Sequence, residues 1–248
     1  MERIRAAAMS EHLKKLLIEG AKAFDADLSS QQAEQFLQYK DILKEWNEKI
    51  NLTAIEDDEE IVIKHFVDSL SILPMIPKKP GQKLIDVGTG GGFPGIPVKL
   101  LRSDVKVTLL DSLDKRIKFL NEVVGLLGLK EITAVHGRAE EFGVKPDYRE
   151  KYDIAVARAV ANLAVLLEYC LPFVKVGGVF IAMKGSNTEE VGAASKALQI
   201  LGGEIEEVKE IILPGSDMKR NIFLIRKLRQ IPSKYPRKAG KPSKEPLI

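Results

Sequence analysis

The chain has little cysteine and histidine and lacks any long apolar run. Cys170 is the single cysteine in 248 residues, which excludes an internal disulfide and favours a reducing compartment. The three scattered histidines show no metal-ligand spacing with it, so we expect no bound metal. No apolar run approaches the ~20 residues that cross a bilayer, and the charged N-terminus does not resemble a signal peptide. These absences predict a cytoplasmic protein without a membrane partner.

The net charge of +3 conceals an uneven distribution along the chain. Residues 219–248 hold ten basic residues and one acidic residue, a net charge of +9, whereas the rest of the chain carries −6. A mildly acidic body with a strongly basic end indicates a polyanionic partner. The alternative is a solvated tail that only aids solubility. Nucleic acid is favoured because the basic segment adjoins the α/β domain that the strand pattern predicts.

The chain is organised around a glycine-rich stretch at residues 83–97, KLIDVGTGGGFPGIP. A short apolar run ends in Asp86, four glycines follow within five positions, and the next segment can start a helix. This order predicts a strand, a tight turn and a helix. Gly88 and Gly90 allow positive φ and let a ligand approach the main chain without a Cβ in the way. The stretch therefore predicts a cofactor loop rather than a purely structural turn.

Two cofactors compete for this loop. Residues 90–95 fit G-x-G-x-x-G, the dinucleotide fingerprint, but the match is unspecific in so glycine-dense a segment. Asp86 would repel a pyrophosphate, whereas it would attract the ammonium group of an amino acid directly or through water. Phe93 and Pro94 also replace the small residues that usually let a pyrophosphate reach the helix. D-V-G-T-G-G-G instead resembles the first motif of class I S-adenosylmethionine methyltransferases.

Apolar periodicity divides the chain into three parts. Residues 1–80 have helical spacing, with a capping box at Ser29 and Gln32, which predicts an N-terminal helical cap. Residues 81–230 alternate strand-length apolar runs with amphipathic helices, as is typical of a Rossmann-like parallel sheet. Residues 231–248 carry four prolines and no helical pattern, which predicts an extended basic arm or a flexible tail. The alternative is that this segment packs on the body and stabilises it.

The predicted fold class is α/β, with a mostly parallel seven-stranded sheet of the class I methyltransferase type. Parallel strands are expected at 83–87, 106–110, 132–135, 152–156 and 178–183. Helices are expected between and after them at 94–102, 113–127, 161–174 and 188–201. Two last strands, near 205–212 and 221–227, leave no room for a helix between them and should pair as an antiparallel hairpin.

In an open α/β sheet the ligand lies beyond the carboxyl ends of the strands. Asp111 ends the second strand about 20 residues past the glycines, where a carboxylate accepts ribose hydroxyls; NAD and S-adenosylmethionine both supply that diol. Ala139 and Glu140 follow the third strand, where backbone groups can contact adenine, although a solvated acidic turn fits equally well. Arg158 follows the fourth strand, where it can hold a phosphate, a carboxylate or a guanine edge.

Several motifs together carry a family resemblance. They are N-L-T-A-I at 51–55, K-H-F-x-D-S-L at 64–70, D-V-G-T-G-G-G-F-P-G-I-P at 86–97, D-S-L-x-K-R at 111–116, R-A-E at 138–140, R-A-V-A at 158–161, K-G at 184–185 and Y-P-R-K-x-G-x-P-x-K-x-P-L at 235–247. From about Leu28 to Leu247 the chain resembles the RsmG (GidB) family, which methylates N7 of a guanine in bacterial 16S ribosomal RNA.

The resemblance implies S-adenosylmethionine as the cofactor and 16S ribosomal RNA or the small ribosomal subunit as the partner. It places five residues at the cofactor: Gly88, Phe93, Ala139, Glu140 and Arg158. Asp86, Gly90 and Asp111 join them from the loop and ribose arguments above. RNA contacts are expected from cations near the site and along the basic end: Lys184, Arg220, Lys234, Arg237, Lys238 and Lys241. We expect the protein to act as a monomer.

The target atom explains why no catalytic acid–base pair is expected. Guanine N7 has a free lone pair and no proton, so its attack on a sulfonium methyl needs positioning but no general base. Arg158 is the one candidate for a contact to the guanine or to a phosphate. The sequence lacks the (D/N)-P-P-(F/Y) motif of amino-group methylation and the cysteine pattern of carbon methylation. A non-catalytic RNA-binding protein and an NAD-dependent oxidoreductase remain as alternatives.

Overall fold

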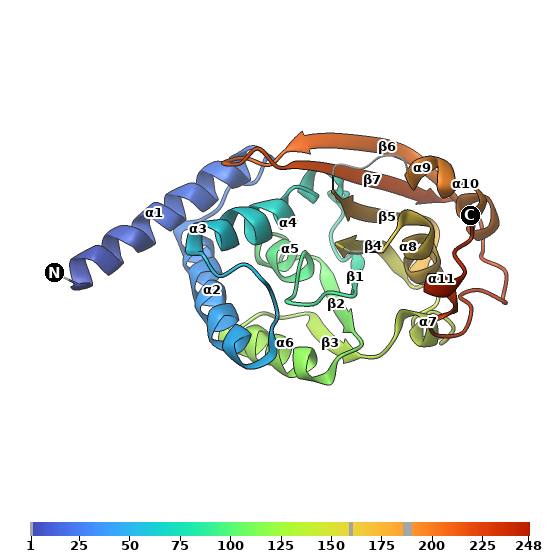
Figure 1. Ribbon diagram of the computed structural model, residues 1–248, viewed down its shortest axis with the longest axis horizontal. Helices are drawn as coiled ribbons and strands as arrows, with labels where there is room; N and C mark the ends of the chain where they lie inside the picture. Colours follow the sequence, from blue (N-terminus) through green and yellow to red (C-terminus); the bar gives the residue numbers. More distant parts are fainter. Residues whose placement is uncertain (1, 159–160, 186–189) are drawn as a thin grey trace.

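A computed structural model describes residues 2–158, 161–185 and 190–248. Within these residues seven strands form one sheet in the order β3-β2-β1-β4-β5-β7-β6 (Figure 1). The first five strands pair in parallel, and β7 pairs antiparallel with β5 and with β6. The strands are β1 (Lys83–Val87), β2 (Lys106–Asp111), β3 (Ile132–His136), β4 (Tyr152–Arg158), β5 (Val174–Lys184), β6 (Gly203–Ile212) and β7 (Lys219–Lys227). The predicted sheet and its antiparallel terminal hairpin are confirmed.

The order of the strands defines where a ligand can bind. The chain builds β1, β2 and β3 outward on one side and then returns to place β4 on the other side of β1. Neighbouring connections therefore diverge at the carboxyl ends of β1 and β4, which leaves a crevice there. The glycine loop begins at the end of β1, so the fold brings it to this crevice.

Alternate residues of the central strands face two separate apolar cores, as the two-residue period of a strand requires. Ile154 and Val156 of β4 belong to one core, whereas Ala155 and Ala157 belong to the other. The first core is covered by α5 (Gly95–Leu101), α6 (Asp114–Leu126) and the N-terminal helices. The second is covered by α8 (Leu163–Cys170), α10 (Ser195–Leu201) and the C-terminal segment.

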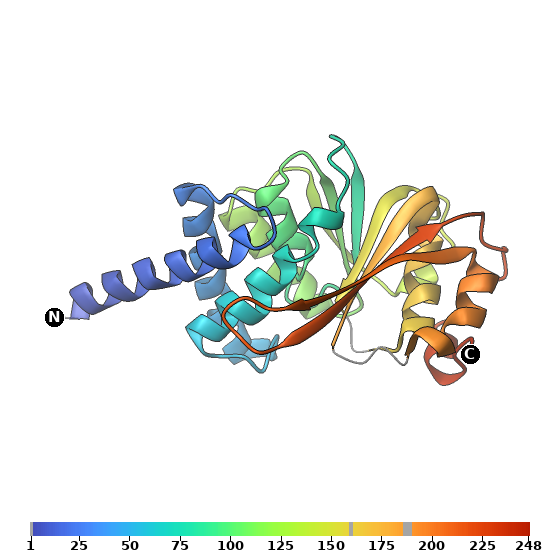
Figure 2. The same ribbon diagram turned by 90° about the horizontal axis from the view of Figure 1, so that it is seen from above.

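The N-terminal helices belong to the first core. They are α1 (Glu2–Lys22), α2 (Ser30–Ile50), α3 (Asp58–Ile61), the π-helix η1 (Val62–Val67), α4 (Asp68–Leu70) and the 3-10 helix η2 (Leu73–Met75). The predicted capping box is confirmed, since Ser29 and Gln32 exchange hydrogen bonds at the start of α2. The first half of α1 projects from the body (Figure 2). The turn between β6 and β7 reaches the N-terminal helices, where Gly215 lies beside Ile63. The division at residue 80 stays a prediction, because apolar residues on both sides of it share this core.

The C-terminal segment, residues 231–248, folds back onto the second core instead of extending into solvent. Ile231, Tyr235 and Leu247 are buried there, and the short helix α11 (Lys241–Lys244) lies near α7 (Ala139–Phe142) and α8 in Figure 1. The expectation of an extended arm is therefore wrong for this segment. The apolar side chains between its prolines bury surface that an extended chain would leave in water.

Smaller differences concern helix and strand ends. The sequence did not predict α7, and β5 begins at Val174, four residues earlier than expected. The expected helix at 188–201 starts outside the described residues; the part described forms α9 (Glu190–Ala193) and α10. Among the helices that the structure describes, none is long and apolar enough to cross a membrane. The same residues contain no group of three or more metal-ligating side chains close enough to hold an ion.

Candidate cofactor site

A pocket of about 520 Å³ lies beyond the carboxyl ends of β1, β2, β3 and β4, at the crevice that the strand order defines. It brings together seven of the eight residues predicted to contact the cofactor: Gly88, Gly90, Phe93, Asp111, Ala139, Glu140 and Arg158. The eighth, Asp86, does not line it. The glycine loop and the strand ends pointed to six of these seven residues, and the family resemblance added Phe93.

The glycine loop forms the floor of this pocket. Gly88 and Gly90 have φ values of +72° and +58°, and a Cβ built on either would meet no atom within 4 Å. Because both residues line the pocket, a side chain at either position would project into space that a ligand needs. Asp111 on β2 accepts a hydrogen bond from the Gly90 amide at 2.9 Å, which ties the loop to the neighbouring strand.

Asp86 lies beneath the loop and not on the pocket surface. It is fully buried, and its Oδ2 accepts hydrogen bonds from the Thr89 hydroxyl at 2.6 Å and the Gly95 amide at 2.8 Å. Its Oδ1 is buried without a hydrogen-bond partner, and burial raises the pKa of this carboxyl to about 6. An unpaired carboxylate oxygen below the floor suits a cationic ligand group and disfavours a pyrophosphate. This fits the ammonium group of S-adenosylmethionine.

Asp111 occupies the position expected for the ribose acceptor, with 2% of its surface exposed. Besides Gly90, its carboxylate accepts from the Leu113 amide at 3.0 Å and from Arg116 Nη1 at 3.3 Å. A carboxylate offers about four acceptor positions, so one position remains while Arg116 is bound. Two ribose hydroxyls therefore require Arg116, which also lines the pocket, to give up its contact.

Arg158 lines the pocket and lies in a cluster built by β4, η1 and α4. Its guanidinium donates to the Lys64 carbonyl at 3.1 Å and to Asp68 at 3.4 Å, and its Nη2 lies 3.1 Å from His65 Nδ1. His65 and Asp68 thus both contact Arg158. The guanidinium also lies over the Phe93 ring at 4.8 Å. These contacts fix the orientation of Arg158 at the pocket wall.

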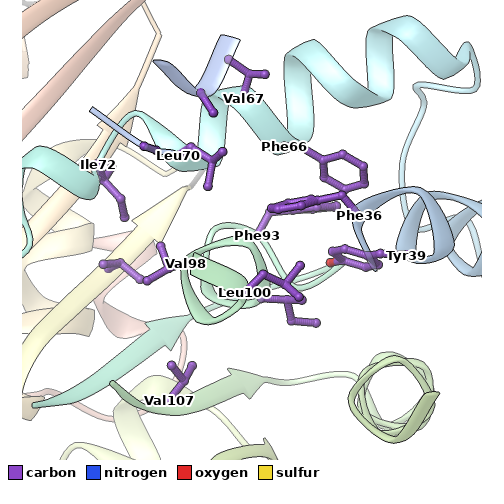
Figure 3. Packing of buried hydrophobic residues seen from close by; sticks show 14 of the residues in the cluster. Phe36, Tyr39, Phe66, Val67, Leu70, Ile72, Phe93, Val98, Leu100 and Val107 are labelled. Carbon is purple, nitrogen blue, oxygen red and sulfur yellow. The ribbon is translucent and has the colours of Figure 1, made fainter. Parts of the chain in front are cut away.

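An aromatic cluster connects the N-terminal helices to the glycine loop. Phe93 of the loop stacks on Tyr39 of α2, with ring centroids 5.4 Å apart (Figure 3). Phe93 also stacks on His65, with centroids 4.6 Å apart. The Tyr39 hydroxyl donates to the Gly91 carbonyl within the same loop. Phe36 and Phe66 complete the cluster. Phe36 and Tyr39 of α2 are therefore core residues, and Tyr39 also supports the glycine loop.

The sequence missed part of the pocket lining. Thr53 comes from the loop between α2 and α3, His65 comes from η1, and Tyr169 comes from α8. Gly240 and Ser243 come from the C-terminal segment, and the Gly240 amide donates to Glu140 at 2.8 Å. Nothing in spacing or periodicity pointed to Gly240 or Ser243.

The six cations predicted to bind RNA fall into two groups. Lys184 is 9% exposed and donates to the Ala161 carbonyl and Glu190. Arg220 pairs with Asp68, and Arg237 pairs with Glu168. The other three are exposed: Lys234, Lys238 and Lys241. The first three must therefore leave protein partners before they can contact a phosphate. Lys234 and Lys238 need not, and Lys241 gives up only an exposed ion pair with Glu245 at 3.5 Å.

The sheet order, together with a pocket at the point between β1 and β4 where the strand order reverses (the switch point), defines a class I S-adenosylmethionine-dependent methyltransferase fold. The solved precorrin-6y C5,15-methyltransferase of Geobacter metallireducens shares it, with a TM-score of 0.50, 14% identity, and coverage of 64% of this chain and 86% of that one. A family model described as "GidB: rRNA small subunit methyltransferase G" matches residues 32–222. The chain belongs to this family.

Two similar proteins are both named "Ribosomal RNA small subunit methyltransferase G". The protein from Acetivibrio thermocellus is 67% identical over 235 residues, which cover 95% of this chain and 97% of that protein. The protein from Alkaliphilus oremlandii is 55% identical over 236 residues, which cover 95% and 99% of the two chains. The family expected from the sequence motifs is confirmed.

Proposed function

We propose that this protein transfers the methyl group of S-adenosylmethionine to N7 of a guanine in 16S ribosomal RNA. The observation that carries the proposal is the pocket at the switch point of the sheet, where the glycine loop, Asp111 and Arg158 converge. Membership in the small-subunit rRNA methyltransferase G family supports both the reaction and the substrate. On this proposal the enzyme works in the cytoplasm, as a monomer, with the ribosomal small subunit or its RNA as partner.

The described pocket residues suit the cofactor from end to end. Gly88 and Gly90 leave room against the main chain, Asp86 offers negative charge below the loop, and Asp111 offers an acceptor for ribose. When bound, S-adenosylmethionine supplies a methyl group on a sulfonium, which requires a lone pair in line with it. The chain's own task is then to hold the two reactants in this alignment.

The titratable groups of the pocket also suit a nucleophile that has no proton to lose. Burial, reinforced by Arg158, lowers the pKa of His65 to about 3, so its imidazole is neutral and a weak base. Asp111 accepts from two backbone amides, and Glu140 accepts from the Gly240 amide. These groups position the main chain, which supports attack by guanine N7 over attack by an amino group that must be deprotonated.

The test is methyl transfer from labelled S-adenosylmethionine to small-subunit RNA and to 30S particles, followed by nuclease digestion and mass spectrometry. We expect 7-methylguanosine. A product such as N6-methyladenosine or 5-methylcytidine would contradict the proposed target. RNA binding without any methylated product would instead support a non-catalytic RNA-binding protein. Calorimetric titrations with S-adenosylhomocysteine and with NADH distinguish the methyltransferase from the oxidoreductase alternative. A methyltransferase should bind the first ligand, and an oxidoreductase should bind the second.

A further inference from the structure

The C-terminal segment reaches the pocket through a defined set of contacts. Arg237 donates from Nε and Nη2 to the Glu168 carboxylate at 2.9 Å and 2.6 Å, and its backbone amide donates to the same carboxylate at 2.8 Å. Glu168 of α8 is 1% exposed, and the Arg237 side chain is 17% exposed. A paired, largely desolvated carboxylate that also binds the main chain holds this part of the segment firmly to α8.

Beyond Arg237 the chain turns directly over the cofactor pocket. Three residues after Arg237, the Gly240 amide donates to Glu140 at 2.8 Å, and Gly240 has a φ of +79°. Gly240 and Ser243 line the pocket together with Ala139, Glu140 and Tyr169, and Tyr169 directly follows Glu168 in α8. Pro242 and Leu247 are buried beside this turn, which fixes its far side.

We propose that the turn at residues 240–243, through Gly240 and Ser243, forms the wall of the pocket that encloses the adenosine end of S-adenosylmethionine. Arg237 and Glu168 are positioning residues that hold this wall in place. The inference rests on the proposed function, because the fold places adenosine near the turn after β3, where Ala139 and Glu140 lie. It assigns the basic C-terminal sequence a role in cofactor binding, in addition to any contact with RNA.

The arrangement of charges distinguishes Arg237 from its neighbours. Lys238 is exposed and does not line the pocket, so its charge is available to solvent and to phosphates. Arg237 uses a planar fork of N–H groups on a buried carboxylate, a geometry that lysine cannot reproduce. Arg237→Lys therefore keeps the positive charge of the segment and removes only the forked contact.

The first experiment compares Arg237→Lys with the neighbouring control Lys238→Gln. We expect Arg237→Lys to raise the dissociation constant of S-adenosylhomocysteine by about five- to tenfold, since the forked ion pair is lost, with the salt dependence of RNA binding unchanged. Lys238→Gln should leave the affinity for S-adenosylhomocysteine unchanged. Hydrogen exchange should show that S-adenosylhomocysteine protects the amides of 238–244 in the wild type and protects them less in Arg237→Lys.

A second pair of variants tests the wall without touching the ion pair. Ser243→Phe places a large side chain at a position that is exposed and lines the pocket, and Lys244→Phe is the matched control outside it. Ser243→Phe should weaken binding of S-adenosylhomocysteine at least tenfold, with the melting temperature of the ligand-free protein equal to that of Lys244→Phe. Unchanged binding in both Arg237→Lys and Ser243→Phe would overturn the wall alone. A wild-type protein that does not bind S-adenosylhomocysteine would overturn the proposed function, and the wall with it.

Discussion

His65 Nδ1 lies 3.1 Å from Arg158 Nη2 and must accept its hydrogen bond, because a guanidinium has no acceptor. The proton of the neutral imidazole is therefore on Nε2, which donates to Thr53 Oγ1 at 2.8 Å. The chain Thr53–His65–Arg158 thus joins the N-terminal helices to the end of β4. It keeps the imidazole neutral next to a cation that the fold places in the pocket wall.

Replacing His65 by asparagine should change how stability depends on pH. The wild-type histidine has a pKa near 6.5 when unfolded and about 3 when folded, so the unfolded chain binds the extra proton between these values. The contribution of His65 to the free energy of unfolding is therefore lost as the pH falls from 6.5 towards 3. The loss is at most about 1.4 kcal/mol per pH unit. Urea unfolding of both proteins between pH 5 and 7.5 should show a steeper rise with pH in the wild type. Parallel curves would contradict a buried neutral His65.

Asp86 should make cofactor affinity depend on pH. Its pKa of about 6 in the folded protein means that the carboxylate is charged above this pH and protonated below it. A bound ammonium group favours the charged form, so affinity for S-adenosylhomocysteine should fall as pH drops below 6, up to about tenfold per pH unit. Asp86→Asn should bind more weakly at pH 8 and lose this dependence. Calorimetry at pH 5 to 8 measures both, and a variant that keeps the dependence would assign it elsewhere.

Asp111→Ala should weaken binding of S-adenosylmethionine by about 1–3 kcal/mol, because ribose hydroxyls and the Gly90 amide both lose their acceptor. Asp114→Ala is the matched control: its carboxylate is three residues away, exposed, and paired with Lys118 outside the pocket. Calorimetric titration of both variants measures the difference. Equal affinity in Asp111→Ala and the wild type would exclude Asp111 as the ribose acceptor.

Lys238→Gln should weaken RNA binding and lower the magnitude of its salt slope by roughly 0.7–0.9, the contribution of one phosphate contact. The exposed control is Lys106→Gln, at the amino end of β2 and thus away from the pocket. In contrast, Lys184→Gln should lower the melting temperature, because Lys184 is buried against Glu190 and a carbonyl. Filter binding across a salt series, beside thermal unfolding, tests all three. If the salt slope of Lys238→Gln equals that of the wild type, Lys238 does not belong to the RNA-binding surface.

Local patterns were sufficient for much of this protein. The glycine loop, the alternation of strands and helices, and the acid at the end of β2 depend on residues that are close in sequence. The carboxyl ends of parallel strands necessarily meet at one edge of the sheet, so Gly88, Asp111 and Arg158 could be placed around one pocket from the sequence alone. The family resemblance rests on the same short motifs.

The tertiary structure decided which charges remain free and which side chains complete the pocket. Arg220 meets Asp68 across 152 positions, and Arg237 meets Glu168 across 69. Such pairs leave no periodic signal, so the basic end looked like an arm open to RNA along its whole length. The apolar residues that lie among its cations are buried in the core beside α8. Burying their surface is more favourable than leaving it in water, as an extended chain would. That burial carries Gly240 to the cofactor pocket, which no spacing along the chain specifies.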